Sequence, residues 1–185
     1  MKIDVSIPYE LGERLGHAYN VAAGRAEDWF LFLDHDLCLV NPWWYEICVR
    51  TIEQYGDKAG LISCYTNRIG NRLQVAPGVD TKSEDLAYHR AFARSLYNRN
   101  RGKVLDHTAE KMRYSGFFIL SRHPVWRAVG GFREDTGGLF HIDVDYCSRV
   151  RAAGFRVLLM ADLYVFHGYW RESMPERRTF ERPVL

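Results

Sequence analysis

One short segment, residues 29–33 (WFLFL), constrains the fold more than any other part of the chain. Its five consecutive apolar residues are flanked by acidic residues on both sides. A strand with no polar position must be covered on both faces of its sheet, as strands of parallel sheets are. Similar runs predict further buried strands at residues 59–65 (AGLISCY), 116–120 (GFFIL), 156–160 and 163–166.

Helical patterns separate these apolar runs. Apolar residues recur at three- and four-residue spacing over residues 11–25, and Asn41 followed by Pro42 is typical of a helix start. Other segments are predicted as a strand (2–7), helices (41–55, 84–100, 143–153) and a helical turn (124–129). Alternating strands and helices predict an α/β, three-layer sandwich with a mostly parallel central sheet. The polar, glycine- and proline-punctuated residues 66–83 predict a long surface loop.

Length and charge restrict the class of protein. The 185 residues fit one domain, expected over residues 1–170, followed by a charged tail at 171–185. The balance of 25 Lys and Arg against 23 Asp and Glu argues against nucleic acid as the main partner. No apolar run approaches a membrane span, the N-terminus lacks a signal-peptide pattern, and the four scattered cysteines indicate reduced thiols. We therefore expect a cytoplasmic protein without a transmembrane segment.

A pair of carboxylates, Asp34 and Asp36, directly follows the most hydrophobic strand. Ligands of open α/β sheets bind beyond the carboxyl ends of the strands, and carboxylate oxygens suit Mg²⁺ or Mn²⁺. The motif is weak by itself. Twelve aspartates in 185 residues give about one D-x-D triplet by chance, and the chain has a second at Asp143 and Asp145.

The other polar residues of interest each permit two interpretations. Asp143 either complements a helix dipole or acts as a general base presented after the glycine-rich residues 130–138. His167 is either a structural histidine or, with Asp36, a metal ligand. Trp43 and Trp44 fit core packing better than a platform for stacking sugars. The absence of G-x-S-x-G, Walker, H-E-x-x-H and G-x-G-x-x-G motifs counts against serine hydrolases, P-loop NTPases, zincins and Rossmann dehydrogenases.

Taken in order, three segments resemble the GT-A glycosyltransferases of the family-2 type, which use nucleotide-sugars. The segment WFLFLDHDLCLVNPWWYE resembles the family's strand, D-x-D motif and following helix. The segment SGFFILSRHPVWRAVGGFRED resembles the sugar-pocket strand and its G-G-F turn. The third segment, HIDVDYCSRVRAAGFRVLLMADLYVFH, resembles the family's E-D-x-D helix and late histidine. The resemblance covers most of residues 7–167.

The resemblance implies a role for each matching residue. Asp36 and His167 would bind Mn²⁺ or Mg²⁺ beside the donor diphosphate, and Asp34 would contact the nucleoside. Asp143 would be the general base of an inverting transfer to an acceptor hydroxyl. The implied donor-sugar pocket contains Ser115, Gly116 and Gly131.

The chain departs from the family pattern at two places. Ile142 replaces the acid that precedes the family's catalytic aspartate. The helix–strand unit that usually follows the first strand and reads the nucleotide base is missing. The candidates that remain for nucleotide contact are Pro8, Tyr9, Glu10, Gly16, His17 and Asn20.

Three functional hypotheses follow from these observations. The leading one is a metal-dependent, inverting glycosyltransferase whose saccharide or other hydroxyl acceptor lies over the 66–83 loop and the basic residues 90–103. Those arginines equally fit a solvated helix face. The D-H-D triplet also permits a metal-dependent phosphoesterase. Ile142 and the missing unit favour a non-catalytic nucleotide- or glycan-binding remnant of a transferase.

Overall fold

The computed structural model describes residues 2–9, 15–134 and 141–168. In chain order the elements of this part are β1 (Ile3–Ser6), α1 (Leu15–Arg25), β2 (Trp29–Leu33), β3 (Leu37–Cys38), α2 (Trp44–Tyr55), β4 (Ala59–Thr66), the 3₁₀ helix η1 (Arg72–Gln74), α3 (Leu86–Asn100), β5 (Val104–Asp106), β6 (Phe118–Arg122), α4 (His123–Ala128), α5 (Ile142–Ala152) and β7 (Arg156–His167). The predicted α/β class is confirmed, and every predicted strand is present. Glu10 and the predicted tail at 171–185 lie outside the described residues.

The strands of the described chain form one seven-stranded mixed sheet in the order β1-β2-β6-β4-β7-β3, with β5 paired to β7. Strands β1, β2, β4 and β7 run in one direction, because β1 pairs parallel to β2, β4 pairs parallel to β7, and β6 is antiparallel to both β2 and β4. The short strands β3 and β5 are antiparallel to β7. The expected parallel arrangement therefore holds for these four strands, while the sheet as a whole is mixed.

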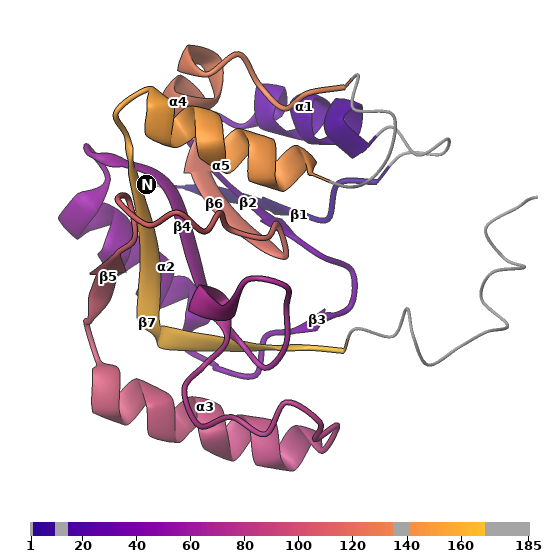
Figure 1. The fold of residues 1–185 in the computed structure, drawn as a ribbon, viewed down its shortest axis with the longest axis vertical. Coiled ribbons are helices and arrows are strands. Elements are labelled where there is room, and N and C mark those ends of the chain that lie inside the picture. The colour runs from indigo at the N-terminus through magenta and orange to yellow at the C-terminus, as the bar shows by residue number, and fades with distance from the viewer. Residues whose placement is uncertain (1, 10–14, 135–140, 169–185) are drawn as a thin grey trace, which may run out of the picture.

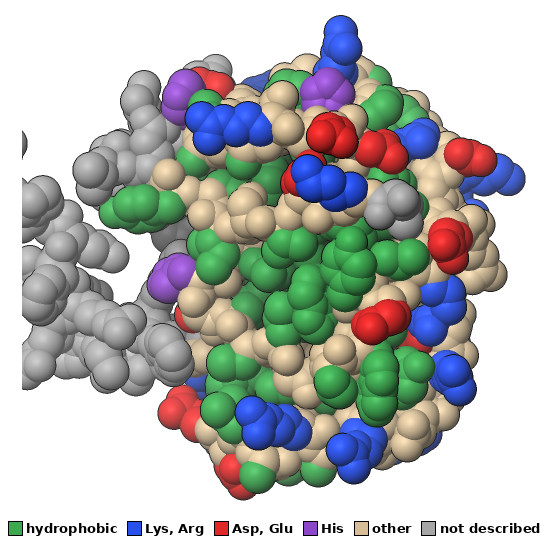
Figure 2. Space-filling view, turned by 180° about the vertical axis from the view of Figure 1, so that it is seen from behind, with side chains coloured by type: hydrophobic (Ala, Val, Ile, Leu, Met, Phe, Trp, Pro, Cys, Tyr) green, Lys and Arg blue, Asp and Glu red, His purple; other side chains and the backbone are tan. Residues whose placement is uncertain are grey.

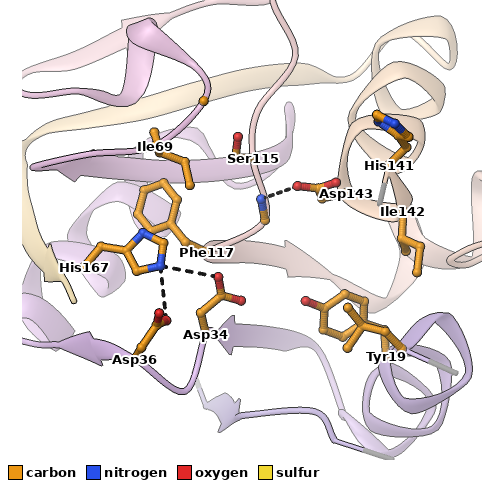
Figure 3. A pocket seen from close by; sticks show the side chains of 13 residues that line it. Tyr19, Asp34, Asp36, Ile69, Ser115, Phe117, His141, Ile142, Asp143 and His167 are labelled. Carbon is orange, nitrogen blue, oxygen red and sulfur yellow. Dashed lines mark hydrogen bonds and ion pairs between the residues drawn. The ribbon is translucent and has the colours of Figure 1, made fainter. Parts of the chain in front are cut away.

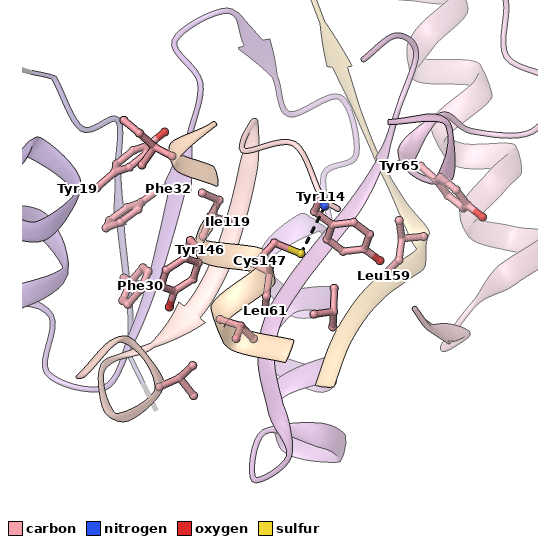
Figure 4. Packing of buried hydrophobic residues seen from close by; sticks show 14 of the residues in the cluster. Tyr19, Phe30, Phe32, Leu61, Tyr65, Tyr114, Ile119, Tyr146, Cys147 and Leu159 are labelled. Atoms are coloured by element: carbon pink, nitrogen blue, oxygen red, sulfur yellow. Dashed lines mark hydrogen bonds between the residues drawn. The ribbon is translucent and has the colours of Figure 1, made fainter. Parts of the chain in front are cut away.

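Helices cover both faces of the sheet, as the apolar runs require. Figure 1 shows α1, α4 and α5 grouped on one side, α2 behind the sheet, and α3 along the far end of β7. Phe30 and Phe32 of β2 pack with α1 and α5 in one core cluster, part of which is drawn in Figure 4. Leu31, between them, faces the opposite way and packs with Ile47 of α2 in a second cluster. The alternation of side chains along β2 thus supplies both cores.

Strand β7 is the one place where two predicted strands form one element. The sequence predicts strands at 156–160 and 163–166, whereas the structure has a continuous strand whose register against β4 shifts between Met160 and Tyr164. β7 bends sharply along its length in Figure 1. Its first part pairs with β5 and its end pairs with β3, two short strands that periodicity did not predict.

The remaining general expectations concern cysteines and membrane spans. All four cysteines are free, and Cys48, Cys64 and Cys147 are buried, as expected for reduced core thiols. Among the described helices, none has both the length and the apolar character needed to cross a bilayer.

Candidate functional site

The loop after β2 carries the first two side chains of the site. Asp34 follows the last residue of β2, and its backbone N–H donates to the carbonyl of Phe117, 3.0 Å away. Asp36 directly precedes β3, in which Leu37 pairs with His167 at the end of β7. The backbone carbonyl of Asp36 also accepts from Gly168 N–H at 2.9 Å. Backbone pairing therefore holds the acidic loop beside His167, a residue 131 positions later in the chain.

The three side chains converge on one point. Nε2 of His167 lies 3.1 Å from Oδ1 of Asp36 and 3.8 Å from Oδ2 of Asp34. One ligand atom from each residue lies within 4.8 Å of the other two (Figure 3). Asp36 and His167 are buried, at 6% and 3% exposed, whereas Asp34 is partly open. Burial raises the pKa of Asp36, but the hydrogen bond and charge of His167 outweigh this and hold the pKa below its ordinary value.

The orientation of His167 suits a metal ligand. Its Nδ1 lies 3.3 Å from the carbonyl oxygen of Arg68, an acceptor to which a protonated Nδ1 can donate. Metal-binding histidines commonly donate their second ring N–H in this way, which leaves the other nitrogen for the metal. That other nitrogen, Nε2, is the atom that faces both carboxylates. Two carboxylates and one imidazole form a donor set that suits Mn²⁺, and Mg²⁺ accepts the carboxylates.

Asn67 fixes the backbone of His167 and was not singled out from the sequence. Its buried side chain accepts from His167 N–H at 2.8 Å and donates to the His167 carbonyl at 3.2 Å. Asn67 is the first residue after β4, and the carboxyl ends of β4 and β7 lie side by side. The ends-of-strands rule could have identified this residue, because β4 was predicted to end nearby.

Asp143 lies across the same cavity, in the first turn of α5. Its Oδ2 accepts from Gly116 N–H at 2.6 Å and its Oδ1 accepts from Val144 N–H at 2.8 Å. Gly116 must lack a side chain here, because a Cβ would lie 2.7 Å from Cβ of Asp143. The close approach of Gly116 to α5 therefore holds the carboxylate in place.

Gln74 supports the neighbouring segment from the 66–83 loop. Its buried amide accepts from Ser115 N–H at 2.8 Å and donates to Ser63 Oγ at 2.8 Å and the Ser115 carbonyl at 3.2 Å. Asn71 in the same loop donates to the Arg113 carbonyl at 2.8 Å. The loop expected to lie on the surface is thus hydrogen-bonded to other parts of the structure through Asn71 and Gln74. Its residues Ile69 and Gly70 line the cavity.

The cavity between these groups has a volume of about 230 Å³. This is less than the roughly 300–1,000 Å³ of pockets that enclose a drug-sized ligand. Two lining residues, Leu15 and His141, directly follow segments 10–14 and 135–140, which lie outside the described residues. Of the site residues expected from the sequence, the cavity brings together Asp34, Asp36, Ser115, Gly116, Asp143 and His167. Tyr19, Phe117 and Ile142 also line it.

Four other predicted site residues do not line this cavity but form a contact between α1 and the residues around 131. Asn20 accepts from Phe132 N–H at 2.7 Å and from Trp126 Nε1 at 3.0 Å, and it donates to the carbonyl of Phe132. His17 pairs with Glu134 at 3.1 Å. Gly16 and Gly131 allow the close approach, since a Cβ would lie 1.9 Å from the Arg133 carbonyl and 2.7 Å from Asn20, respectively.

Pro8 and Tyr9 follow β1 and also lie outside the cavity lining, with Tyr9 78% exposed. The buried residue Ile142, 3% exposed, packs into the core cluster of α1 and α5, so its position serves packing. The aromatic pair at the start of α2 is divided: Trp44 packs against the second core cluster, while Trp43 is 40% exposed and stacks on Tyr97.

No protein-family model and no curated protein matches the sequence, so these comparisons assign no family to the chain.

Proposed function

We propose that this chain is a metal-dependent glycosyltransferase of the GT-A type that transfers a sugar from a nucleoside-diphosphate sugar to an acceptor hydroxyl with inversion. The observation that carries the proposal is the meeting of Asp34, Asp36 and His167 at one point, with Asp143 facing them across one cavity. These residues come from the segments that resemble the family, and the resemblance did not guarantee their proximity.

The metal-binding residues would act on the donor. A bound Mn²⁺ or Mg²⁺ ion would neutralise the charge that develops on the departing diphosphate. Asp36 and His167 would hold that ion, with the orientation of the imidazole set by the Arg68 carbonyl and that of its backbone by Asn67. Asp34 is the more exposed acid and would also face the nucleoside.

Asp143 would act on the acceptor. A carboxylate offers about four acceptor positions, and backbone N–H groups use two of those on Asp143. The remaining positions can accept the proton of a hydroxyl as its oxygen attacks the anomeric carbon. The two backbone bonds keep the carboxylate in one orientation, which is what a positioned base requires.

The first experiment measures donor binding. Calorimetric titration with UDP-, GDP- and TDP-sugars, with and without Mn²⁺, should find one nucleotide that binds only when the metal is present. Asp36→Asn should abolish this metal dependence, whereas Glu53→Gln, an exposed acid on α2, should not change it. Failure of every nucleotide to bind in the presence of Mn²⁺ would contradict the proposal.

The second experiment tests the base. Asp143→Asn should retain donor binding and lose transfer by about 10²–10⁴-fold, the usual contribution of a general base. Near-normal transfer would exclude Asp143 from this role. Donor binding without turnover in the unaltered protein would favour the non-catalytic binding module, and Mg²⁺-dependent hydrolysis of simple phosphate esters would favour a phosphoesterase.

A further inference from the structure

A second hollow lies away from the acidic cavity, between α3 and the segment that joins β3 to α2. It measures about 410 Å³, and its walls include Leu39, Val40 and Pro42 on one side and Leu86, Arg90 and Arg94 on the other. A third hollow of about 480 Å³ adjoins it at Arg90 and Arg94 and is otherwise lined by Ala91, Ser95 and Asn98. The two arginines therefore line both hollows, beside the apolar side chains of the first.

The spacing along α3 explains this arrangement. Leu86, Arg90 and Arg94 are four residues apart, so they lie on one face of the helix. Four residues of α-helix rise about 6 Å, so the two guanidinium groups start from points one turn apart and can bind one anion together. Each guanidinium offers planar paired donors, which match the oxygens of a phosphate or carboxylate.

Arg90 and Arg94 form no ion pair with the described residues. Helix α3 contains no acidic residue, and both arginines are exposed. The ion pairs that arginines form among the described residues involve Arg50, Arg68, Arg133, Arg149 and Arg156. In Figure 2, basic and apolar side chains adjoin at the lower end of the molecule, where Figure 1 places α3.

We propose that this hollow binds an amphipathic anion, a single apolar chain that ends in a phosphate or carboxylate. The head group would lie between Arg90 and Arg94, and the chain would cover Leu39, Pro42 and Leu86. The hollow is concave and its apolar side chains form the walls, so it fits one chain better than the flat surface of a bilayer. The proposal goes beyond the glycosyltransferase hypothesis and needs neither the metal ligands nor Asp143.

Octyl phosphate is the probe, measured by calorimetry below its micelle concentration. It should bind at least tenfold more tightly than inorganic phosphate or octanol. Only octyl phosphate has both an anionic group for the two arginines and an apolar chain for the apolar side chains of the hollow. Hexyl phosphate should bind more weakly, since each buried methylene contributes up to about fourfold in affinity. Octanoate should bind to the same residues, with its carboxylate between Arg90 and Arg94.

Variants separate the two halves of the site. The double variant Arg90→Gln, Arg94→Gln should weaken octyl phosphate binding at least tenfold, as expected for lost hydrogen bonds to a charged group. Leu86→Gln should weaken octyl phosphate but leave the affinity for inorganic phosphate unchanged. Arg99→Gln is the matched control, because Arg99 is nine residues from Arg90 and so lies on the opposite side of α3.

Three outcomes would overturn the proposal. One is equal binding of inorganic phosphate and octyl phosphate, which would indicate a simple anion site. Another is an equal loss of affinity in Arg99→Gln, which would indicate non-specific attraction to a basic helix. The third is binding to phosphatidylglycerol vesicles without binding of monomeric octyl phosphate, which would indicate a membrane surface. Because Asp143→Asn and Asp36→Asn leave this hollow intact, they should bind octyl phosphate normally, and failure of the glycosyltransferase proposal would not affect this test.

Discussion

At the residue scale, Gly116 determines whether Asp143 can sit where it does. Gly116→Ala would place a methyl group 2.7 Å from Cβ of Asp143 and force the start of α5 away from residues 115–117. Displacement of a catalytic group by about 1 Å can cost about 100-fold in rate, so we expect a loss of transfer of that order. Gly70→Ala is the matched control, since it lines the same cavity and its added Cβ would meet nothing within 4 Å. Equal effects of the two variants would contradict this reading of Gly116.

Asp162, inside β7, is a buried acid that sequence reasoning did not identify. Its Oδ2 accepts from Arg50 and from Gly102 N–H, while its Oδ1 is buried without a hydrogen-bond partner among the described residues. Asp162 is fully buried, whereas the Arg50 side chain is 35% exposed.

This asymmetry predicts which partner is costlier to remove. Arg50→Met leaves a buried charge and should destabilise the fold by about 3–5 kcal/mol. Asp162→Asn leaves an arginine that can turn towards water, and should cost less, about 1–2 kcal/mol for the weakened hydrogen bonds. Urea denaturation of both single variants and of the double variant measures which variant loses more free energy of unfolding. It also measures the energetic coupling between the two side chains. A smaller loss in Arg50→Met than in Asp162→Asn would contradict this order.

At the scale of elements, β1 lies at one open edge of the sheet. Within the described part of the chain it pairs only with β2, and it exposes Val5 (43%) and, just beyond the strand, Ile7 (54%). Exposed apolar edge strands promote pairing with other chains. Ile7→Lys should therefore reduce concentration-dependent association without lowering the melting temperature. Sedimentation velocity at increasing concentration tests this, with Val21→Lys, an exposed position on α1, as control.

The helices and strands also differ in whether the sequence alone could predict them. β2 is a continuous apolar run, and β4 is apolar except at Ser63 and Thr66. Helix α3 has an Asp85 cap whose side chain accepts from Ala87 N–H at 2.8 Å. The residues that specify such elements are neighbours in the sequence, so a local pattern predicts them. β3 has two residues and β5 has three, and each exists because β7 supplies a partner for it. Periodicity cannot report a pairing made across more than 50 residues.

At the scale of the whole molecule, the proposed metal would join distant parts of the chain. Asp34 and Asp36 belong to the loop after β2, and His167 ends β7. Mn²⁺ at 100 times its Kd should stabilise the fold by about 2.7 kcal/mol, or roughly 5–10 °C in Tm. Thermal denaturation with and without Mn²⁺ measures this, and Asp36→Asn should remove the shift while Glu53→Gln retains it. An equal shift in Asp36→Asn would place the ion elsewhere.

The sequence by itself determined the alternation of buried strands and helices. It therefore also determined that Asp34, Asp36 and His167 lie at the carboxyl ends of strands, at one edge of the sheet. Local hydrophobic pattern is sufficient for this, because it reflects which residues must leave water. Only the tertiary structure decided that His167 faces both carboxylates and that Gln74 and Asn67 hold the site from a supposed surface loop. It also decided that Asn20 bonds to Phe132, in close approach to Gly131, rather than lining the cavity. These are single hydrogen bonds and close approaches between residues far apart in the chain, and their geometry depends on packing that no local pattern records.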